Sequence, residues 1–425
     1  MITRIEATRY RCFERLDLDL QSFGVLVGAN GAGKTTLLDI PGLLGDCLDQ
    51  RSIGQAFVSR INSRPPRSTT LQELISGGHG KDFILAVEAE LPEEVRQSLL
   101  DGQSDAVLNN RERWLRFIRY EIRLEIFNKR ELVVGCEYLF LFAKSNTPAR
   151  DTARLHGECK PHRDWRFIIR RGPGSKASLR VETKKGAKSK EIHIDALMLA
   201  LPRVKFESTR DVPAASWFHN LLANGCIFYQ PNIELLQTAS PPGLPTTLMA
   251  DGANLPWLAM ELQKNKNRFQ LWVEHIQTAL PQVVNIKITE REEDHHAYFV
   301  VTYNGGHEVT SSGLSEGTLR VLALTILPYL ANLPKIIFTE EPENGIHPRA
   351  IEAVLQSLSS VYDSQVLISS HSPVVLAQSD LETILCARLE SNGAASIISG
   401  PEHPQLKDWQ GQIDLGALFA AGVLG

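Results

Sequence analysis

The sequence has few cysteines and lacks a long apolar run. Its six cysteines are scattered, and no two of them form a C-x-x-C pair, which favours a reducing compartment over a disulfide framework. No apolar stretch reaches the roughly 18 to 20 residues that a membrane span needs. The N-terminal stretch also lacks the apolar core of a signal peptide. We therefore expect a cytoplasmic protein that does not contact a membrane.

Sustained heptads and internal repeats are also absent, and the missing heptads exclude a long coiled coil. The 425 residues are 43% apolar and 22% charged, which is the composition of an ordinary globular protein. A chain of this length can bury a large core and is expected to form two domains.

The net charge of −4 is unevenly distributed along the chain. The segment from Lys144 to Lys190 holds 14 Lys and Arg against 4 Asp and Glu, so its net charge is +10 and the remainder carries −14. Such a block is typical of a polyanion contact such as DNA, although a solvated loop explains it equally well.

The segment "VGANGAGKTT", residues 27–36, matches the P-loop pattern G-x-x-x-x-G-K-T. The apolar "FGVLV" before it predicts a strand, and "KTTLLDI" after it predicts a helix that ends or kinks at Pro41. Backbone amides and the helix N-terminus would hold phosphate, with Lys34 on the β- and γ-phosphates and Thr35 on Mg²⁺. The expected nucleotide contacts are Gly28, Asn30, Gly31, Ala32, Gly33, Lys34, Thr35 and Thr36.

Two adjacent carboxylates follow an apolar strand in "KIIFTEE", which is the Walker B pattern. Like charges side by side repel each other in a poor dielectric, and Mg²⁺ carried by the nucleotide would compensate them. Glu340 is expected to hold the metal, directly or through water. Glu341 is expected to orient or deprotonate the attacking water.

Two further motifs follow the P-loop in the chain. The polar loop in "SSGLSEGTLRVLALTILPYL", residues 311–330, opens an apolar helix, and "QVLISSHSPVVL" predicts a buried strand ending at His371. The order of these motifs around the Walker B strand resembles the motif order of ABC-type ATPase heads of the SMC and RecF kind. "LSEGT" is similar to the L-S-G-G-Q signature, with Glu316 and Thr318 departing from it. "ENGIHP" occupies the place of the D-loop.

The resemblance extends to the predicted AAA-family ATPases related to RecF and to overcoming-lysogenisation-defect nucleases, and it covers residues 1–48 and roughly 225–425. It implies an α/β head with a mixed sheet, flanking helices and a β-rich insertion. The expected division is 1–50 for the first part of the head, 51–225 for the insertion, and 226–425 for the second part.

The resemblance also implies how the head would work. Ser315 and Gly317 would bind the γ-phosphate of an ATP held by another copy of the chain, and His371 would bond the γ-phosphate as the switch histidine. A head-to-tail homodimer or higher oligomer with two ATP molecules and Mg²⁺ follows. The Q-loop glutamine is not assigned, with Gln55 and Gln72 as candidates.

The middle of the chain alternates apolar and polar residues, which predicts a compact, strand-rich lid. "WRFIIRRGPGSKASLRVET" predicts a hairpin. Trp165 and Phe167 could stack on bases, but packing within the hairpin is favoured. The expected DNA contacts are Arg163, Arg166, Arg170 and Arg171. His156, Cys159 and His162 have spacing compatible with zinc, but no fourth ligand is evident.

The resemblance implies a DNA-engaging ATPase that controls a partner effector in bacterial anti-phage defence or DNA repair. About 25 residues follow the last predicted strand, too few for a nuclease domain, so a nuclease would be a separate partner. The alternative is an ATP-gated scaffold that sequesters or releases a partner protein without binding DNA. A transporter ATPase is disfavoured, because "ENGIHP" and the large insertion differ from transporter heads.

Overall fold

The computed structural model describes residues 1–61, 65–101, 108–150, 154–158, 161–182, 189–204, 211–406 and 415–422. The chain forms two compact units, and each draws on both ends of the sequence. The first unit comprises Met1–Gln21, Gly31–Gly225 and Arg388–Ile397, and the second comprises Ser22–Asn30, Cys226–Ala387 and Ile398–Gly425. Compact units need not coincide with a head and an insertion, so the boundaries expected at residues 50 and 225 stay a prediction.

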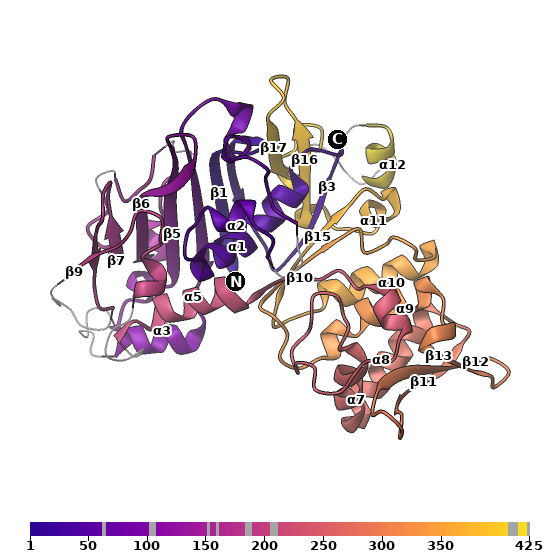
Figure 1. The fold of residues 1–425 in the computed structure, drawn as a ribbon. Helices are drawn as coiled ribbons and strands as arrows, with labels where there is room; N and C mark the ends of the chain where they lie inside the picture. The colour runs from indigo at the N-terminus through magenta and orange to yellow at the C-terminus, as the bar shows by residue number, and fades with distance from the viewer. Residues whose placement is uncertain are drawn as a thin grey trace. The chain divides into compact units, whose positions relative to one another are not determined.

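The first unit is built on an antiparallel sheet with the strand order β2-β1-β4-β5-β6-β7-β8-β9 (Figure 1). The lid strands therefore extend the same sheet as the first two strands of the chain. Buried and partly exposed residues mix along these strands, as expected for strands packed on one face. The strands are β1 Ile2–Tyr10, β2 Phe13–Asp19, β4 Asp82–Glu90, β5 Phe117–Phe127, β6 Glu131–Phe142, β7 Arg166–Arg171, β8 Lys176–Leu179 and β9 Lys190–His193.

Helices of the first unit pack on this sheet through aromatic contacts. Tyr120 of β5 meets Phe218 of α5 edge-on, with ring centroids 6.0 Å apart, and Phe57 of α2 meets Phe83 of β4 at the same distance. The helices are α1 Lys34–Asp49, α2 Gln55–Val58, α3 Glu93–Leu100 and α5 Pro213–Asn224.

The lid hairpin predicted from "WRFIIRRGPGSKASLRVET" is present, because β7 pairs with β8 across a turn at residues 172–175. Phe167 is 6% exposed and contacts Tyr138 and Phe140. Trp165 stacks on Phe140 with centroids 4.7 Å apart. The preference for packing over base stacking is therefore supported for Phe167, whereas Trp165 stays half-buried.

Of the two expectations for Pro41, that helix α1 ends there is wrong, whereas a kink there stays a prediction. The helix continues to Asp49 with Pro41 buried inside it, although a proline there removes one helical hydrogen bond. Tertiary packing compensates for the loss: a Cβ added to Gly45 would lie 2.2 Å from the Leu222 carbonyl oxygen, so α1 and α5 touch backbone to backbone.

The second unit is built around β10, β14, β15, β3 and most of β16, which belong to a six-stranded sheet with the order β10-β14-β15-β3-β16-β17. The pairs β10–β14, β14–β15, β15–β3 and β3–β16 are all parallel. The apolar runs of "FGVLV", "KIIFT" and "QVLIS" are buried in it, as expected for a parallel sheet covered on both faces. The strands are β3 Phe23–Gly28, β10 Cys226–Phe228, β14 Ile336–Glu340, β15 Gln365–Ser370, β16 Ile384–Leu389 and β17 Ala395–Ser399.

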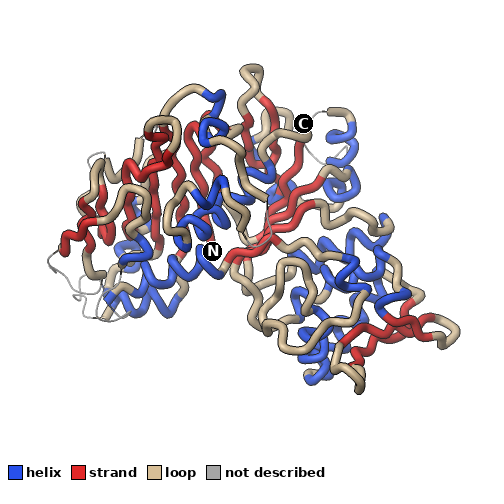
Figure 2. The backbone as a smooth tube through the Cα atoms, viewed as in Figure 1, coloured by secondary structure: helices blue, strands red, loops and turns tan. Residues whose placement is uncertain are grey.

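Helices and a small antiparallel sheet complete the second unit, with the sheet at its margin in Figure 2. None of the helices in the described ranges is long and apolar enough to cross a membrane. The helices are α6 Ile233–Gln237, α7 Leu255–Lys264, α8 Lys266–Ala279, α9 Glu316–Thr325, α10 Pro348–Ser359, α11 Pro373–Ala377 and α12 Leu415–Ala420. The small sheet consists of β11 Val283–Glu290, β12 Ala297–Tyr303 and β13 Glu308–Thr310.

Candidate functional site

Three strands of the second unit end at the same edge of the parallel sheet. In the register, Glu340 of β14 lies opposite Ser369 of β15, and Ser370 lies opposite Val27 of β3. The carboxyl ends of parallel strands form the edge where α/β proteins bind ligands. The sheet therefore brings together the start of the P-loop, the Walker B carboxylates and the strand that precedes His371.

The P-loop leads from β3 into helix α1, which begins at Lys34. Gly33 caps this helix in a left-handed conformation with φ of 90°, and a Cβ there would lie 2.8 Å from the Phe13 ring. Only glycine fits that position without strain. The first turn of α1 contains no acidic residue, so its positive end is left for an anion.

Glu341 follows β14 directly and has a left-handed backbone, with φ of 44°. Such a conformation costs on the order of 1 kcal/mol in a residue with a side chain. Its amide donates to the Ser369 carbonyl oxygen at 2.7 Å, and Asn344 donates through Nδ2 to its Oε2 atom. These bonds fix both the turn and the carboxylate.

His371 lies beside this carboxylate. Its Nε2 atom is 3.8 Å from Oε1 of Glu341, and the two side chains are 32% and 41% exposed. Both groups are therefore accessible to a substrate and are close enough to act on the same one. Glu340 is half-buried at the end of β14.

Glu343 is a residue of this edge that the sequence interpretation did not single out. The hydroxyl of Ser370 donates to Oε1 of Glu343, and the Ser372 amide donates to that hydroxyl at 2.9 Å. Burial raises the pKa of Glu343, while the Ser370 hydrogen bond opposes the shift. The loop after β14 is thus tied to the segment that carries His371. The only sequence signal was a second acid two residues after Glu341.

The predicted signature loop forms the N-terminus of α9. The Oγ atom of Ser315 caps the helix by accepting from the Thr318 amide at 3.2 Å, and it lies 2.9 Å from the Thr318 hydroxyl. A Cβ on Gly317 would lie 2.7 Å from the Gly345 carbonyl oxygen. Thr318 departs from the signature pattern, and here its hydroxyl holds the capping serine.

The two Q-loop candidates lie in the first unit. Gln72 donates through Nε2 to the Gly78 carbonyl oxygen at 2.7 Å, so its side chain closes its own loop. Gln55 is exposed at the start of α2. The surroundings of neither glutamine favour it as the Q-loop residue, and the assignment stays open.

The zinc hypothesis finds no support in the described part of the chain, where no three His, Cys, Asp or Glu residues are grouped to hold a metal. His156 is buried, with Nδ1 2.8 Å from Glu121 and Nε2 2.9 Å from the Ala149 carbonyl oxygen. Both ring nitrogens are therefore occupied. Cys159 lies outside the described residues, and His162 is exposed.

The four arginines expected to contact DNA differ in their surroundings. Arg171 is fully buried and donates to the carbonyl oxygens of Met198 and Asp195 at 2.6 and 2.9 Å, so the expectation is wrong for this residue. Because Arg171 lies inside the fold, its guanidinium bonds backbone carbonyl oxygens and does not reach the surface. The Arg170 guanidinium lies 3.8 Å from the centre of the Phe167 ring, as a cation–π pair.

The fold is similar to that of solved ATPase heads. The chain aligns with a crystal structure of the Smc head bound to the C-winged helix domain of ScpA, with a TM-score of 0.51 and 12% identity over 93% of this chain and 97% of that one. An Smc head domain from Pyrococcus furiosus aligns with a TM-score of 0.48 and 11% identity over 93% and 95%. The first of these alignments shows that the chain has an SMC-head-like ATPase fold, consistent with the predicted head and β-rich insertion.

The family follows from the sequence. A family profile described as "AAA domain, putative AbiEii toxin, Type IV TA system" matches residues 160–377, about half of the chain, and the chain belongs to this family. It is also 33% identical to the Old nuclease of Escherichia phage P2 over 94 residues, which cover 19% of this chain and 16% of that protein. The chain is therefore a P-loop ATPase of this AAA-domain family by sequence, with an SMC-head-like fold, and its finer branch stays a prediction.

Proposed function

We propose that the protein hydrolyses ATP with the help of Mg²⁺. The observation that supports this best is the placement of Glu341 and His371, 3.8 Å apart, at the sheet edge where β3 also ends. Glu341 would orient the attacking water and accept its proton, because its carboxylate is exposed and its backbone is fixed. His371 would donate to the γ-phosphate from the adjacent position.

The P-loop residues would bind the phosphates of ATP. Lys34 would contact the β- and γ-phosphates, with the amides of residues 28–36 around them. Thr35 and Glu340 supply hydroxyl and carboxylate oxygens, the hard ligands that Mg²⁺ prefers. When bound, Mg²⁺ neutralises phosphate charge.

We propose further that two copies of the chain close head to tail around two ATP molecules. The N-terminus of α9 would donate to the γ-phosphate of the partner copy through the Ser315 hydroxyl and the Gly317 amide, with the helix dipole behind them. The close packing of Gly317 on the loop after β14 supports this arrangement, since it places the proposed signature next to the loop that begins with Glu341.

The closed state would license a partner effector such as a nuclease, in anti-phage defence or DNA repair. The likeness to the Old nuclease of phage P2 and the net charge of +10 between Lys144 and Lys190 support DNA engagement. The second candidate is an ATP-gated scaffold that holds a partner protein without DNA, in the cytoplasm. ATPase stimulation by DNA would favour the first.

Phosphate release under steady-state turnover tests the proposed hydrolysis. Lys34→Ala should lower turnover at least about a hundredfold, because the phosphate charge loses the fixed cation of the loop. Lys266→Ala, at an exposed lysine at the start of α8, should leave turnover unchanged. Equal turnover in folded Lys34→Ala and wild-type protein would place the activity elsewhere.

A further inference from the structure

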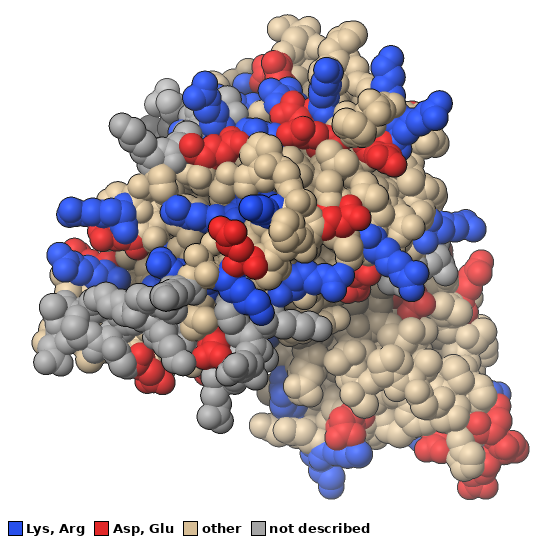
Figure 3. Space-filling view, turned by 60° about the vertical axis from the view of Figure 1, so that its left-hand side comes forward, with Lys and Arg blue, Asp and Glu red and all other residues tan. Residues whose placement is uncertain are grey.

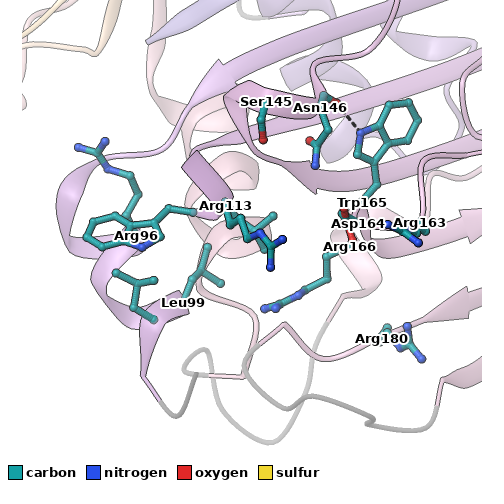
Figure 4. Close-up of a pocket in the computed structure, with 13 residues that line it drawn as sticks. Arg96, Leu99, Arg113, Ser145, Asn146, Arg163, Asp164, Trp165, Arg166 and Arg180 are labelled. Atoms are coloured by element: carbon teal, nitrogen blue, oxygen red, sulfur yellow. Dashed lines mark hydrogen bonds between the residues drawn. The ribbon is translucent and has the colours of Figure 1, made fainter. Parts of the chain in front are cut away.

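A basic pocket of about 520 Å³ lies within the first unit (Figure 4). Its walls come from α3, from the short turn Arg111–Arg113, from the turn Lys144–Asn146 and from the start of β7. Arg113 and Arg166 extend into it from opposite sides. Five arginines line the pocket: Arg96, Arg113, Arg163, Arg166 and Arg180.

The positive charge of the pocket is only partly compensated. Arg96 is paired with Glu93 at 2.6 Å. Arg113 and Arg163 are exposed, and their guanidinium groups have no hydrogen-bond or ion-pair partner in the described ranges. Asp164 is the acidic residue of the lining, and its carboxylate lies 3.8 Å from His162.

Arg166 adds a further positive charge to the pocket, and this charge is partly compensated. Its guanidinium donates to the Glu182 carbonyl oxygen at 2.7 Å. Burial lowers the pKa of Arg166, the Glu182 carboxylate opposes this shift, and Arg180 lowers the pKa further. Arg166 is half-buried, and the Glu182 carboxylate compensates its charge in part.

The remaining lining is largely apolar and includes Leu99, Leu115, Trp114 and Trp165. Trp165 is held rigidly, because its ring stacks on Phe140 and its Nε1 donates to the Asn146 carbonyl oxygen at 2.7 Å. A fixed aromatic wall next to unmatched guanidinium groups suits a ligand that has both a planar ring and a phosphate.

We propose that this pocket binds a nucleotide unit, with its phosphate on Arg113 and Arg163 and its base against the tryptophan-lined wall. Guanidinium groups bind phosphate through two parallel hydrogen bonds. The volume is within the range of sites that enclose one small ligand. The source is a free nucleotide or the phosphorylated end of a single strand, since a duplex keeps its bases stacked inside.

The face of the molecule seen in Figure 3 favours a local pocket there over an extended binding surface. Figure 3 shows Lys and Arg side chains interspersed with Asp and Glu on the face in view. The inference deepens the proposed engagement of DNA and rests on it for its biological role. Its test requires no ATP hydrolysis, so failure of the hydrolysis proposal and failure of the pocket proposal remain distinguishable.

Fluorescence anisotropy on the full chain, in EDTA and without ATP, tests the proposal. The probes are a labelled single strand with a 5′-phosphate, the same strand without it, and a duplex, with AMP and inorganic phosphate as competitors. Arg113→Gln with Arg163→Gln removes two charges from the pocket. Lys129→Gln with Arg130→Gln removes two from an exposed turn between β5 and β6 and serves as the control.

We expect the 5′-phosphorylated strand to bind more tightly than the unphosphorylated one. The pocket variant should weaken binding about tenfold or more. It should also make the slope of log affinity against log salt concentration less steep, by about 0.7 for each phosphate group that the arginines no longer neutralise. The control should change the affinity less than about twofold. AMP competing as well as the strand would identify a free nucleotide as the ligand, and weaker competition would identify a strand end.

Equal affinity and equal salt dependence in the pocket variant and the control would overturn the proposal. So would a duplex that binds as tightly as the phosphorylated strand, or inorganic phosphate that displaces the strand as well as AMP does. A phosphoserine peptide that binds the pocket more tightly than any nucleotide would overturn the ligand class.

Discussion

Gly317 of helix α9 lies directly against Gly345 of the loop after β14: a Cβ on Gly317 would be 2.7 Å from the Gly345 carbonyl oxygen. Glu341, Glu343 and Gly345 belong to the same loop. The helix proposed to contact ATP in a partner copy is therefore packed on the loop proposed to activate water. We expect a movement of one to shift the other, because no flexible side chain lies between the two backbones at this contact.

Gly317→Ala should disturb this contact. A methyl group that meets a backbone oxygen at 2.7 Å forces a shift, and overpacking of this kind costs about 1 to 3 kcal/mol. We expect lower stability in urea and a loss of turnover larger than the loss of ATP binding. Gly42→Ala, inside α1 with nothing within 4 Å of its added Cβ, should stabilise the protein or leave it unchanged. Unaltered turnover in Gly317→Ala would mean that the contact is incidental.

Ser315→Arg should block turnover while each chain still binds ATP, because a bulky side chain would enter the space proposed for the partner's nucleotide. Ser315→Ala should lose only the helix cap, worth about 1 kcal/mol, and keep part of the activity. An equimolar mixture of Ser315→Arg and Lys34→Ala places both changes in one site of a heterodimer and leaves the other site intact.

The mixture should then recover about a quarter of wild-type turnover, if subunits mix at random and the two sites act independently. Phosphate release is measured before and after mixing, with heterodimers verified by differently tagged chains. No recovery in verified heterodimers would contradict independent shared sites.

Glu343 should act as a positioning residue through Ser370. Glu343→Ala removes the acceptor of the Ser370 hydroxyl and should lower kcat more than it changes KM, by about tenfold. Glu343→Gln keeps an acceptor oxygen and should restore most of kcat. If Glu343 had a purely structural role, Glu343→Ala and Glu343→Gln proteins of equal stability would have the same kcat.

The ionisation of Glu343 also predicts a pH dependence of stability. Burial raises the pKa of Glu343 above 4.5, so the folded protein holds this proton to higher pH than the unfolded chain does. The free energy of unfolding therefore falls as pH rises through the raised pKa. Between pH 5 and pH 8, wild-type protein should lose more stability than Glu343→Gln in urea titrations. Equal losses of stability in the wild-type and Glu343→Gln proteins would show that ionisation of Glu343 does not destabilise the fold.

Local sequence patterns predicted the three strands that lead to the candidate site and the motifs at their ends. "FGVLV", "KIIFT" and "QVLIS" are short apolar runs, and a parallel sheet buries such strands on both faces. Their common edge followed from the order of the motifs. The hairpin of β7 and β8 was predicted because glycine and proline separate two alternating segments.

The features that local sequence patterns did not predict depend on contacts between residues far apart in the chain. The joining of β1 and β4 into one sheet depends on pairing between Ile2–Tyr10 and Asp82–Glu90, which no local pattern encodes. Pro41 remains within a helix because α5 supports it. Arg171 belongs to the basic segment, where surface cations are expected, but the sheet register places its side chain in the interior. Glu343 became visible only through its contact with Ser370.

The central claim is that ATP closes two chains around paired sites in which Glu341 activates water. Glu341→Gln keeps the size of the side chain but removes the base, so hydrolysis should become very slow while Mg·ATP still binds. Glu340→Gln should instead weaken nucleotide binding and its dependence on Mg²⁺, since a metal ligand is lost.

Sedimentation velocity of Glu341→Gln with ATP or ADP, with trapped nucleotide and turnover measured on the same sample, tests this claim most directly. The account predicts a stable, ATP-dependent dimer that retains unhydrolysed ATP, and no such dimer with ADP. Normal hydrolysis by Glu341→Gln, or the same assembly state with ATP and with ADP, would contradict it.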